Sequence, residues 1–190
     1  MDTRTLLIAK FLERNSRLNL SAIRDAHGVY EKHIIDALTL VQFDVIQSGM
    51  TVADVGTGWW WPLLALAQQY PDTHFVWIDA RAKKLQAVQA IALESWLSNV
   101  QIKWGRIEQM HERYDIVTAR AVAYADVLLD WIHPLVKTTG MMILYKLDTD
   151  EENGIIITWC QMMWYMIVHQ YKYTILWDQT PRVLWILQKW

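Results

Sequence analysis

The sequence predicts a doubly wound α/β fold, in which helices cover both faces of a mostly parallel sheet. Three observations support this. Short apolar, β-branched segments alternate with helical segments over residues 51–146, a glycine turn follows the first of these strands, and an acidic residue ends the second. Strands and helices that alternate in this way are joined by right-handed crossovers, which place successive strands parallel in one sheet.

Length and composition limit the class of protein. The chain has 190 residues and a net charge of −2, so we expect one domain, residues 1–190, without an overall basic field for nucleic acid. The one cysteine, Cys160, excludes an internal disulfide, and the histidines lack the spacing of metal ligands, so no metal site is expected. No apolar run reaches the roughly 20 residues that span a bilayer. We therefore expect a cytoplasmic protein without a membrane contact.

The N-terminal part, residues 1–48, is expected to form a helical extension packed on this domain. Residues 5–18 place apolar side chains among charged ones at helical spacing, which is typical of an amphipathic helix. A second helix is expected over residues 30–45, with His33 and Asp36 near its start.

The remaining elements follow from apolar runs and from the turn residues between them. Expected in order are a strand at 51–55, a helix at 62–70, a strand at 74–79, a helix at 81–97, a strand at 100–104, a helical turn near 107–111, a strand at 114–119, a helix at 124–136, a turn at 139–140, a strand at 141–146 and a helix at about 149–165. Two β-rich segments, 168–177 and 182–188, end the chain. Residues 178–181 are expected to form the turn of this antiparallel pair at one edge of the sheet.

The glycine turn after the first strand is the strongest functional signal. Gly56 and Gly58 can adopt positive φ angles and let an anionic or nucleoside ligand approach the backbone. Asp79 ends the next strand roughly 20 residues later, where an acid accepts hydrogen bonds from ribose hydroxyls. This pair favours nucleoside binding without separating NAD from S-adenosylmethionine. A hydride-transfer enzyme is disfavoured because no Tyr-x-x-x-Lys motif occurs, and Tyr145 and Lys146 are adjacent instead.

Six short motifs, in order, resemble one family. They are Asn19–Asp25, Glu31–Asp36, Asp54–Gly58, Ile78–Asp79 with Lys83–Lys84, Arg106–Glu108 and Thr118–Ala121. Over roughly residues 15–188 the chain resembles the bacterial small-subunit (16S) ribosomal RNA guanine-N7 methyltransferases, also called the glucose-inhibited division protein B family. The resemblance implies a seven-stranded class I S-adenosylmethionine methyltransferase (Rossmann-like) fold with N-terminal helices. It also implies S-adenosylmethionine as cofactor and ribosomal RNA or the small ribosomal subunit as partner.

The resemblance also implies roles for particular residues. Cofactor contacts fall on Gly56, Gly58, Trp61, Asp79, Ile107, Glu108 and Arg120. The catalytic or base-pocket positions fall on Asn19, Arg24, His33, Asp36 and Lys146. Guanine N7 carries a lone pair and no proton, so its methylation needs no general base, and positioning should dominate catalysis.

The cofactor loop departs from the family pattern. The family continues Gly-Thr-Gly-x-Gly-Phe-Pro-Gly, whereas Trp60 here replaces the third glycine and Trp61 the aromatic or leucine position. An indole at residue 60 must swing out to solvent or occupy space near the methionine end of the cofactor. The alternative function is therefore a catalytically impaired or redesigned methyltransferase-fold scaffold whose cofactor site is occluded by Trp59, Trp60 and Trp61.

The C-terminal part is unusually apolar. The helix over residues 155–165 is apolar nearly all round, so it is either buried on every side or part of an interface. We expect a homo-oligomer formed through residues 155–168 and the C-terminal strands, with Trp159, Met162 and Trp164 as candidate contacts.

The tryptophan loop generates the first testable prediction. If Trp60 projects into the cofactor crevice, Trp60→Gly will raise the affinity for S-adenosylmethionine in calorimetric titration, because glycine removes the steric exclusion. Unchanged affinity would mean that the indole points outward and would remove the argument for an occluded site.

Overall fold

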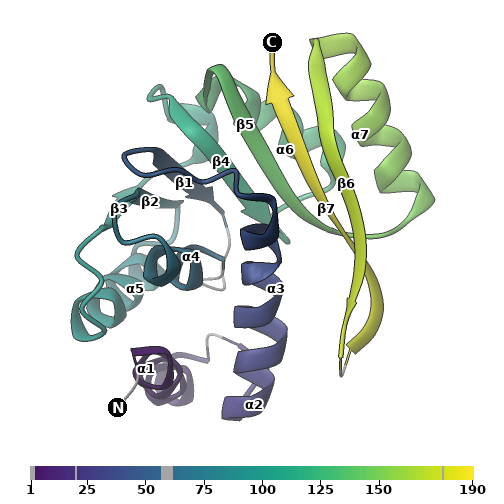
Figure 1. Cartoon of the computed structure of the whole chain (residues 1–190). Coiled ribbons are helices and arrows are strands. Elements are labelled where there is room, and N and C mark those ends of the chain that lie inside the picture. The colour runs from purple at the N-terminus through teal and green to yellow at the C-terminus, as the bar shows by residue number, and fades with distance from the viewer. Residues whose placement is uncertain (1–2, 20, 57–61, 177) are drawn as a thin grey trace.

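The computed structural model describes residues 3–19, 21–56, 62–176 and 178–190. Within these ranges a seven-stranded sheet has the order β3-β2-β1-β4-β5-β7-β6 (Figure 1). The strands are β1 Thr51–Val55, β2 His74–Asp79, β3 Val100–Trp104, β4 Tyr114–Arg120, β5 Val136–Leu147, β6 Tyr165–Ile175 and β7 Asp178–Lys189. The strands β1 to β5 pair in parallel, and β7 pairs antiparallel with both β5 and β6. This confirms the predicted doubly wound sheet with an antiparallel pair at one edge.

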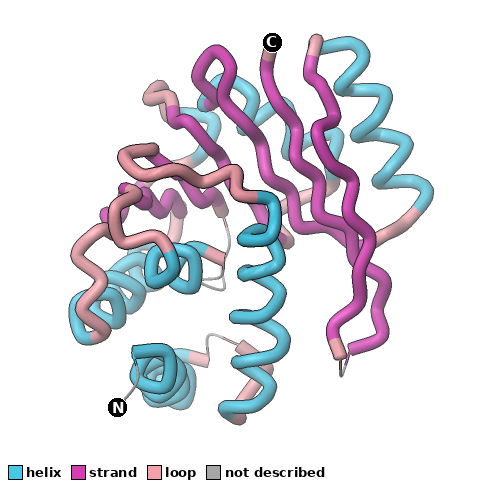
Figure 2. Tube along the Cα trace, in the orientation of Figure 1, coloured by secondary structure: helices cyan, strands magenta, loops and turns pink. Residues whose placement is uncertain are grey.

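Helices cover both faces of the sheet. They are α1 Thr3–Leu18, α2 Ala26–Val29, α3 Asp36–Leu38, α4 Leu63–Gln69, α5 Ala82–Glu94, α6 Ala125–Ile132 and α7 Asp150–Met163, with short π or 3₁₀ turns η1 Tyr30–Ile35, η2 Thr39–Phe43, η3 Ile107–Gln109 and η4 His133–Leu135. Helices α1 to α5 lie on one side of the sheet, and α6 and α7 lie on the other (Figure 1). The segment from α2 to η2 forms one continuous helical run, which begins earlier than the expected residue 30 (Figure 2).

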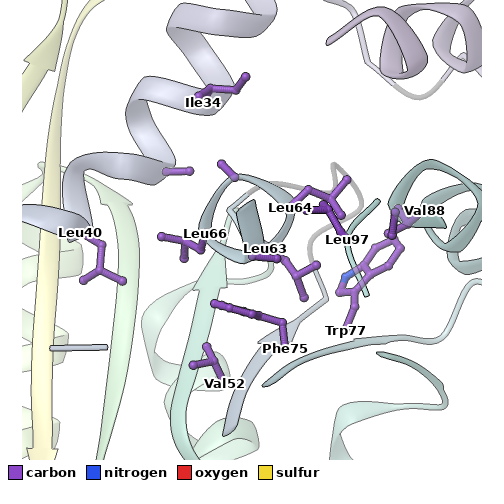
Figure 3. Close-up of a cluster of buried hydrophobic side chains, with 14 of the residues drawn as sticks. Ile34, Leu40, Val52, Leu63, Leu64, Leu66, Phe75, Trp77, Val88 and Leu97 are labelled. Carbon is purple, nitrogen blue, oxygen red and sulfur yellow. The ribbon is translucent and has the colours of Figure 1, made fainter. Parts of the chain in front are cut away.

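Two apolar layers sandwich the central strands, because alternate side chains of a buried parallel strand point to opposite faces. Val52 of β1 belongs to the layer under α3, α4 and α5, and the next residue, Ala53, belongs to the layer under α6 and α7. Figure 3 shows the first layer, where Leu66 of α4 and Phe75 and Trp77 of β2 lie together and are fully buried. Because both layers pack on the same strands, the carboxyl ends of the parallel strands lie together at one end of the sheet, and the site forms there.

The helix α1 is attached to α5 by apolar packing and by a surface ion pair. Leu7 and Phe11 are buried on the side that faces the domain. Arg14 Nη2 donates to Glu94 Oε1 at 2.6 Å, and this hydrogen bond lowers the pKa of Glu94 to about 2. An exposed pair of this kind stabilises by about 1 kcal/mol at most, so the buried side chains carry most of the attachment.

Two expected turns are parts of strands instead. Residues 139–140 lie within β5. The register of the pairing between β4 and β5 shifts between Tyr114 and Ile116, and this shift accommodates the irregular backbone of Thr139, whose φ is +65°. At Gly140, a Cβ would approach the Asp115 carbonyl oxygen to 2.8 Å, so the glycine allows close strand packing rather than a chain reversal.

The second of these turns, expected at residues 178–181, belongs to β7. Asp178 already pairs with Ile175 of β6, so β7 begins at the first residue of the expected turn. The register shifts between Tyr173 and Ile175, so residues 179–181 form an irregular segment within β7. Asp178 holds this segment, because its Oδ1 accepts a hydrogen bond from the Thr180 N–H at 3.1 Å and its Oδ2 accepts one from Arg182 Nη2 at 2.7 Å. Among the described residues, no helix has both the length and the apolar character to cross a membrane.

Candidate functional site

Two adjoining hollows lie at the carboxyl ends of the parallel strands, where ligands bind in open α/β sheets. The first, here called the β1–β3 hollow, has a volume of about 200 Å³, and its lining includes Gly56, Asp79, Arg81, Gly105, Ile107 and Val122. The second, the β4–β5 hollow, has a volume of about 560 Å³, and its lining includes Arg120, Val122, Tyr124, Lys146, Glu152 and Tyr173. Because Val122 lines both, a ligand in one hollow can lie against a ligand in the other.

Gly56 makes the turn that opens the β1–β3 hollow. Its φ is +67°, and its N–H donates to the Ile78 carbonyl oxygen at 2.9 Å. A Cβ at this position would lie 2.6 Å from Val122 Cγ1, so only glycine fits without a shift of the neighbouring loop. The other predicted loop contacts, Gly58 and Trp61, lie outside the described residues, as does the proposed obstruction by residues 59–61.

Asp79 presents an unused acceptor to this hollow. The residue is 3% exposed, and its Oδ1 accepts a hydrogen bond from the Arg81 backbone N–H at 2.8 Å. Its Oδ2 is buried and has no hydrogen-bond partner among the described residues. Buried carboxylate oxygens are normally hydrogen-bonded, so this atom is suited to a ligand that brings hydroxyl groups.

The far wall of the β1–β3 hollow comes from the segment after β3. Ile107 is 8% exposed and offers an apolar surface, while Glu108 next to it is exposed. The backbone N–H of Gly105 donates to the Asp79 carbonyl oxygen at 3.1 Å, and its φ of +155° turns the chain into this wall. Sequence reasoning missed Gly105, although a glycine directly after a strand is a signal for such a turn.

Asp36 connects the N-terminal helical run to the sheet. It is 1% exposed and lies on α3, and its Oδ2 is 3.0 Å from Arg120 Nε and 3.9 Å from Arg182 Nη1. Tyr173 donates its hydroxyl to Asp36 Oδ1 at 2.7 Å. Burial, together with the neighbouring carboxylate, raises the pKa of Tyr173, so the tyrosine keeps the proton that it donates.

Arg120 completes this connection from β4. Its Nη2 donates to the Lys32 carbonyl oxygen at 2.8 Å, so one guanidinium holds both the side chain and the backbone of the helical run. Tyr145 of β5 adds a third attachment, because its hydroxyl donates to the Ala37 carbonyl oxygen at 2.8 Å. Arg120, Tyr145 and Tyr173 all line the β4–β5 hollow. The helical run therefore fixes the positions of three side chains that form the floor of this hollow.

His33, Asn19 and Arg24 line neither hollow. His33 is buried beside Phe11, and its Nε2 lies 3.5 Å from Ser21 Oγ. Burial and the nearby Arg120 charge lower the pKa of His33 to about 3, so the ring is neutral at physiological pH.

Asn19 and Arg24 contact each other on the loop after α1. Arg24 Nη2 donates to Asn19 Oδ1, and its Nη1 donates to the Asn15 carbonyl oxygen at 3.2 Å. Asn19 has a φ of +51°, a conformation that asparagine tolerates better than most residues. Both residues are exposed.

Lys146 does reach the β4–β5 hollow. Its ammonium donates to the Ala123 carbonyl oxygen at 2.7 Å and lies 2.8 Å from Glu152 Oε2 on α7. Lys146 is therefore paired with an acid. Sequence reasoning missed Glu152, because an acidic residue in the first turn of a helix is commonly explained by the helix dipole alone.

One expected surface contact is wrong. Trp159 is 6% exposed, and its indole N–H donates to Asp130 Oδ1 of α6 at 2.9 Å, so it packs within its own chain. Met162 and Trp164 are exposed by 65% and 78%. One face of α7 packs on α6 and buries Trp159, whereas Met162 and Trp164, the residue after the helix, remain exposed.

Comparisons of the sequence with known families identify relatives. The model of the family described as rRNA small subunit methyltransferase G matches residues 4–161. Relatives named ribosomal RNA small subunit methyltransferase G include those of Sorangium cellulosum, 34% identical over 80% of this chain and 66% of the relative, and Lactobacillus helveticus, 37% identical over 77% of this chain and 65% of the relative. The chain thus spans just under two thirds of the length of these relatives.

Solved structures share the fold. The magnesium protoporphyrin IX methyltransferase from Synechocystis, solved with bound S-adenosylmethionine, has a TM-score of 0.70 at 13% identity and covers 100% of this chain and 98% of its own. A methyltransferase from Aquifex aeolicus that depends on S-adenosylmethionine has a TM-score of 0.66 at 13% identity over 93% of this chain and 97% of its own. The fold is that of the class I S-adenosylmethionine methyltransferases, as the sequence resemblance implied.

The Asp36 contacts generate a stability prediction. Asp36→Ala leaves the Arg120 guanidinium buried without its partner, so we expect the free energy of unfolding in urea to fall by roughly 3–5 kcal/mol. Glu13→Ala, which removes exposed ion pairs with Arg17 and Lys10, should cost about 1 kcal/mol at most. Equal losses in the two variants would contradict the structural role of Asp36.

Proposed function

This chain belongs to the rRNA small subunit methyltransferase G family, and we propose that it transfers a methyl group from S-adenosylmethionine to N7 of a guanine in small-subunit ribosomal RNA. The observation that carries the proposal is the buried Oδ2 of Asp79, which has no hydrogen-bond partner among the described residues and lies at the β1–β3 hollow of a chain with this ancestry. The substrate is ribosomal RNA or the assembled small subunit, and the reaction belongs in the cytoplasm, where ribosomes are. Residues 1–190 act as one methyltransferase domain that carries the helical extension 1–48.

The residues of the β1–β3 hollow fit the nucleoside part of the cofactor. Asp79 Oδ2 accepts hydrogen bonds from ribose hydroxyls, and the bare backbone of Gly56 leaves room for the ligand. Ile107 provides an apolar surface for the adenine, and Glu108 lies at its exposed edge. Arg120, which lines the β4–β5 hollow, is assigned to the cofactor by the family resemblance, as are Gly58 and Trp61. When bound, the cofactor supplies a methyl group on a positively charged sulfur.

The remaining residues act by positioning. Guanine N7 attacks through its lone pair, so no side chain has to take a proton, and the neutral His33 is consistent with this. Asp36 holds Arg120 from the helical run. His33, which packs on Phe11 and lies 3.5 Å from Ser21 Oγ, supports the helical run itself. Lys146 fixes the loop after β4 through the Ala123 carbonyl oxygen. Asn19 and Arg24, which are exposed, are proposed to contact the RNA backbone.

The cofactor assignment is tested by calorimetric titration with S-adenosylmethionine. Asp79→Ala should weaken binding at least tenfold, because hydrogen bonds to a charged group contribute roughly 1.5–3 kcal/mol. Asp72→Ala, an exposed acid in the turn before β2, should bind as the unaltered chain does. Activity is measured as 7-methylguanosine, detected by mass spectrometry in small subunits from cells that lack this modification.

Two results would argue against this assignment. Equal binding by Asp79→Ala and the unaltered chain would move the cofactor out of the β1–β3 hollow. Absence of heat at millimolar ligand, which corresponds to about 4 kcal/mol of binding free energy, would favour the occluded scaffold instead of the enzyme.

Self-association through residues 155–168 and the C-terminal strands is a separate proposal. Its support is that β6 is an edge strand, that Met166 on this strand is exposed, and that Met162 and Trp164 just before it are exposed too. Sedimentation at several concentrations should detect a dimer that Trp164→Ser weakens. Leu93→Ser, which alters an exposed apolar residue on α5, should leave the dimer intact. A monomer at every concentration would contradict the proposal.

A further inference from the structure

The β4–β5 hollow has an aromatic rim. Tyr124 lies in the connection between β4 and α6, immediately before the first residue of α6. It lines the hollow and is 69% exposed. The backbone beside it is held in place, because Lys146 donates to the carbonyl oxygen of Ala123 at 2.7 Å. An exposed aromatic residue on a held backbone at the mouth of a hollow is suited to stack on a planar base.

The same hollow has an acidic wall. Glu152 is 9% exposed and lies in the first turn of α7, where its backbone N–H donates to Thr149 Oγ1 at 3.3 Å. Its Oε2 is 2.8 Å from Lys146 Nζ, so the carboxylate is held between β5 and α7. A buried ion pair is costly to desolvate, and its position beside an open hollow indicates a use other than stability.

The order of the sheet places this acid away from the β1–β3 hollow. Val122, which both hollows share, follows β4, whereas Glu152 lies on α7 after β5, on the opposite side of β4 from β1. A base that lies between Glu152 and Val122 would have one edge towards Glu152 and the opposite edge towards the β1–β3 hollow.

The chemistry of the purines decides which base suits this arrangement. Guanine carries two kinds of N–H donor, N1–H and the N2 amino group, on its Watson–Crick edge, and a carboxylate accepts from such donors. N7 lies on the opposite side of the ring system. Adenine presents the N1 lone pair in place of N1–H, which a carboxylate repels, and inosine lacks the N2 amino group. A site built to accept particular N–H groups rejects analogues that lack them.

We propose that Glu152 is the residue that selects guanine in this hollow, by accepting hydrogen bonds from the Watson–Crick edge of a base stacked on Tyr124. This inference rests on the proposed function, because it concerns the base that the enzyme methylates. In this arrangement N7 points towards the β1–β3 hollow, and Lys146 keeps the carboxylate in place. A base in a duplex cannot reach the hollow, so the target nucleotide is unpaired or flipped out.

The test uses fluorescein-labelled oligouridines with one central guanosine, inosine or adenosine, and it measures anisotropy with the full chain. The guanosine oligonucleotide should bind roughly tenfold more tightly than the inosine one, and adenosine should bind more weakly still. Glu152→Gln should bring guanosine and inosine to within twofold of each other. Tyr124→Ala should weaken all three oligonucleotides alike, since stacking depends little on base identity, and Tyr124→Phe should restore binding.

Glu112→Gln is the matched control, because it removes the same charge from an exposed residue that lines neither hollow and should keep the guanosine preference. Equal or absent binding of the three oligonucleotides by the unaltered chain would overturn the inference without any variant. Methylation of small subunits together with equal oligonucleotide binding would refute the role of Glu152 and leave the proposed function standing. A guanosine preference that needs Glu152, without methyl transfer, would support the base site and refute the proposed function.

Discussion

The buried ion pair between Asp36 and Arg120 is the contact on which the rest of the site depends. It joins the N-terminal helical run to the carboxyl end of β4, with an Oδ2 to Nε distance of 3.0 Å. Tyr173 and Arg182 bring β6 and β7 to the same carboxylate. Because removal of one partner leaves a charge in the interior, these elements keep one relative arrangement. The floor of the β4–β5 hollow is therefore held by residues that do not need to touch a substrate.

The two hollows divide the work of the proposed enzyme according to their chemistry. The β1–β3 hollow is small and offers a buried carboxylate oxygen at Asp79 and the bare backbone of Gly56, which suits a ribose and its neighbouring groups. The β4–β5 hollow is larger and combines the aromatic ring of Tyr124 with the paired acid Glu152. Val122 is their common wall, so two ligands can meet in line without a general base between them.

Most of the fold was predictable, and the exceptions have physical reasons. The strands from 51–55 to 114–119 were found because apolar, β-branched runs are local signals. The turns expected at 139–140 and 178–181 were wrong, because Gly140 serves close packing between strands and Asp178 is stabilised by pairing with β6. Residues such as glycine and aspartate allow a turn but do not require one, and tertiary contacts decide whether the chain turns or continues as a strand.

The sequence by itself determined the fold class, the family and the strand ends that carry Gly56 and Asp79, because these depend on residues close together in the chain. Only the tertiary structure decided which charges meet. Arg120 contacts Asp36 and the Lys32 carbonyl oxygen across a long stretch of chain, and Lys146 is paired with an acid of the following helix. Long-range pairing depends on how the elements pack, and residue spacing within one motif does not contain that information.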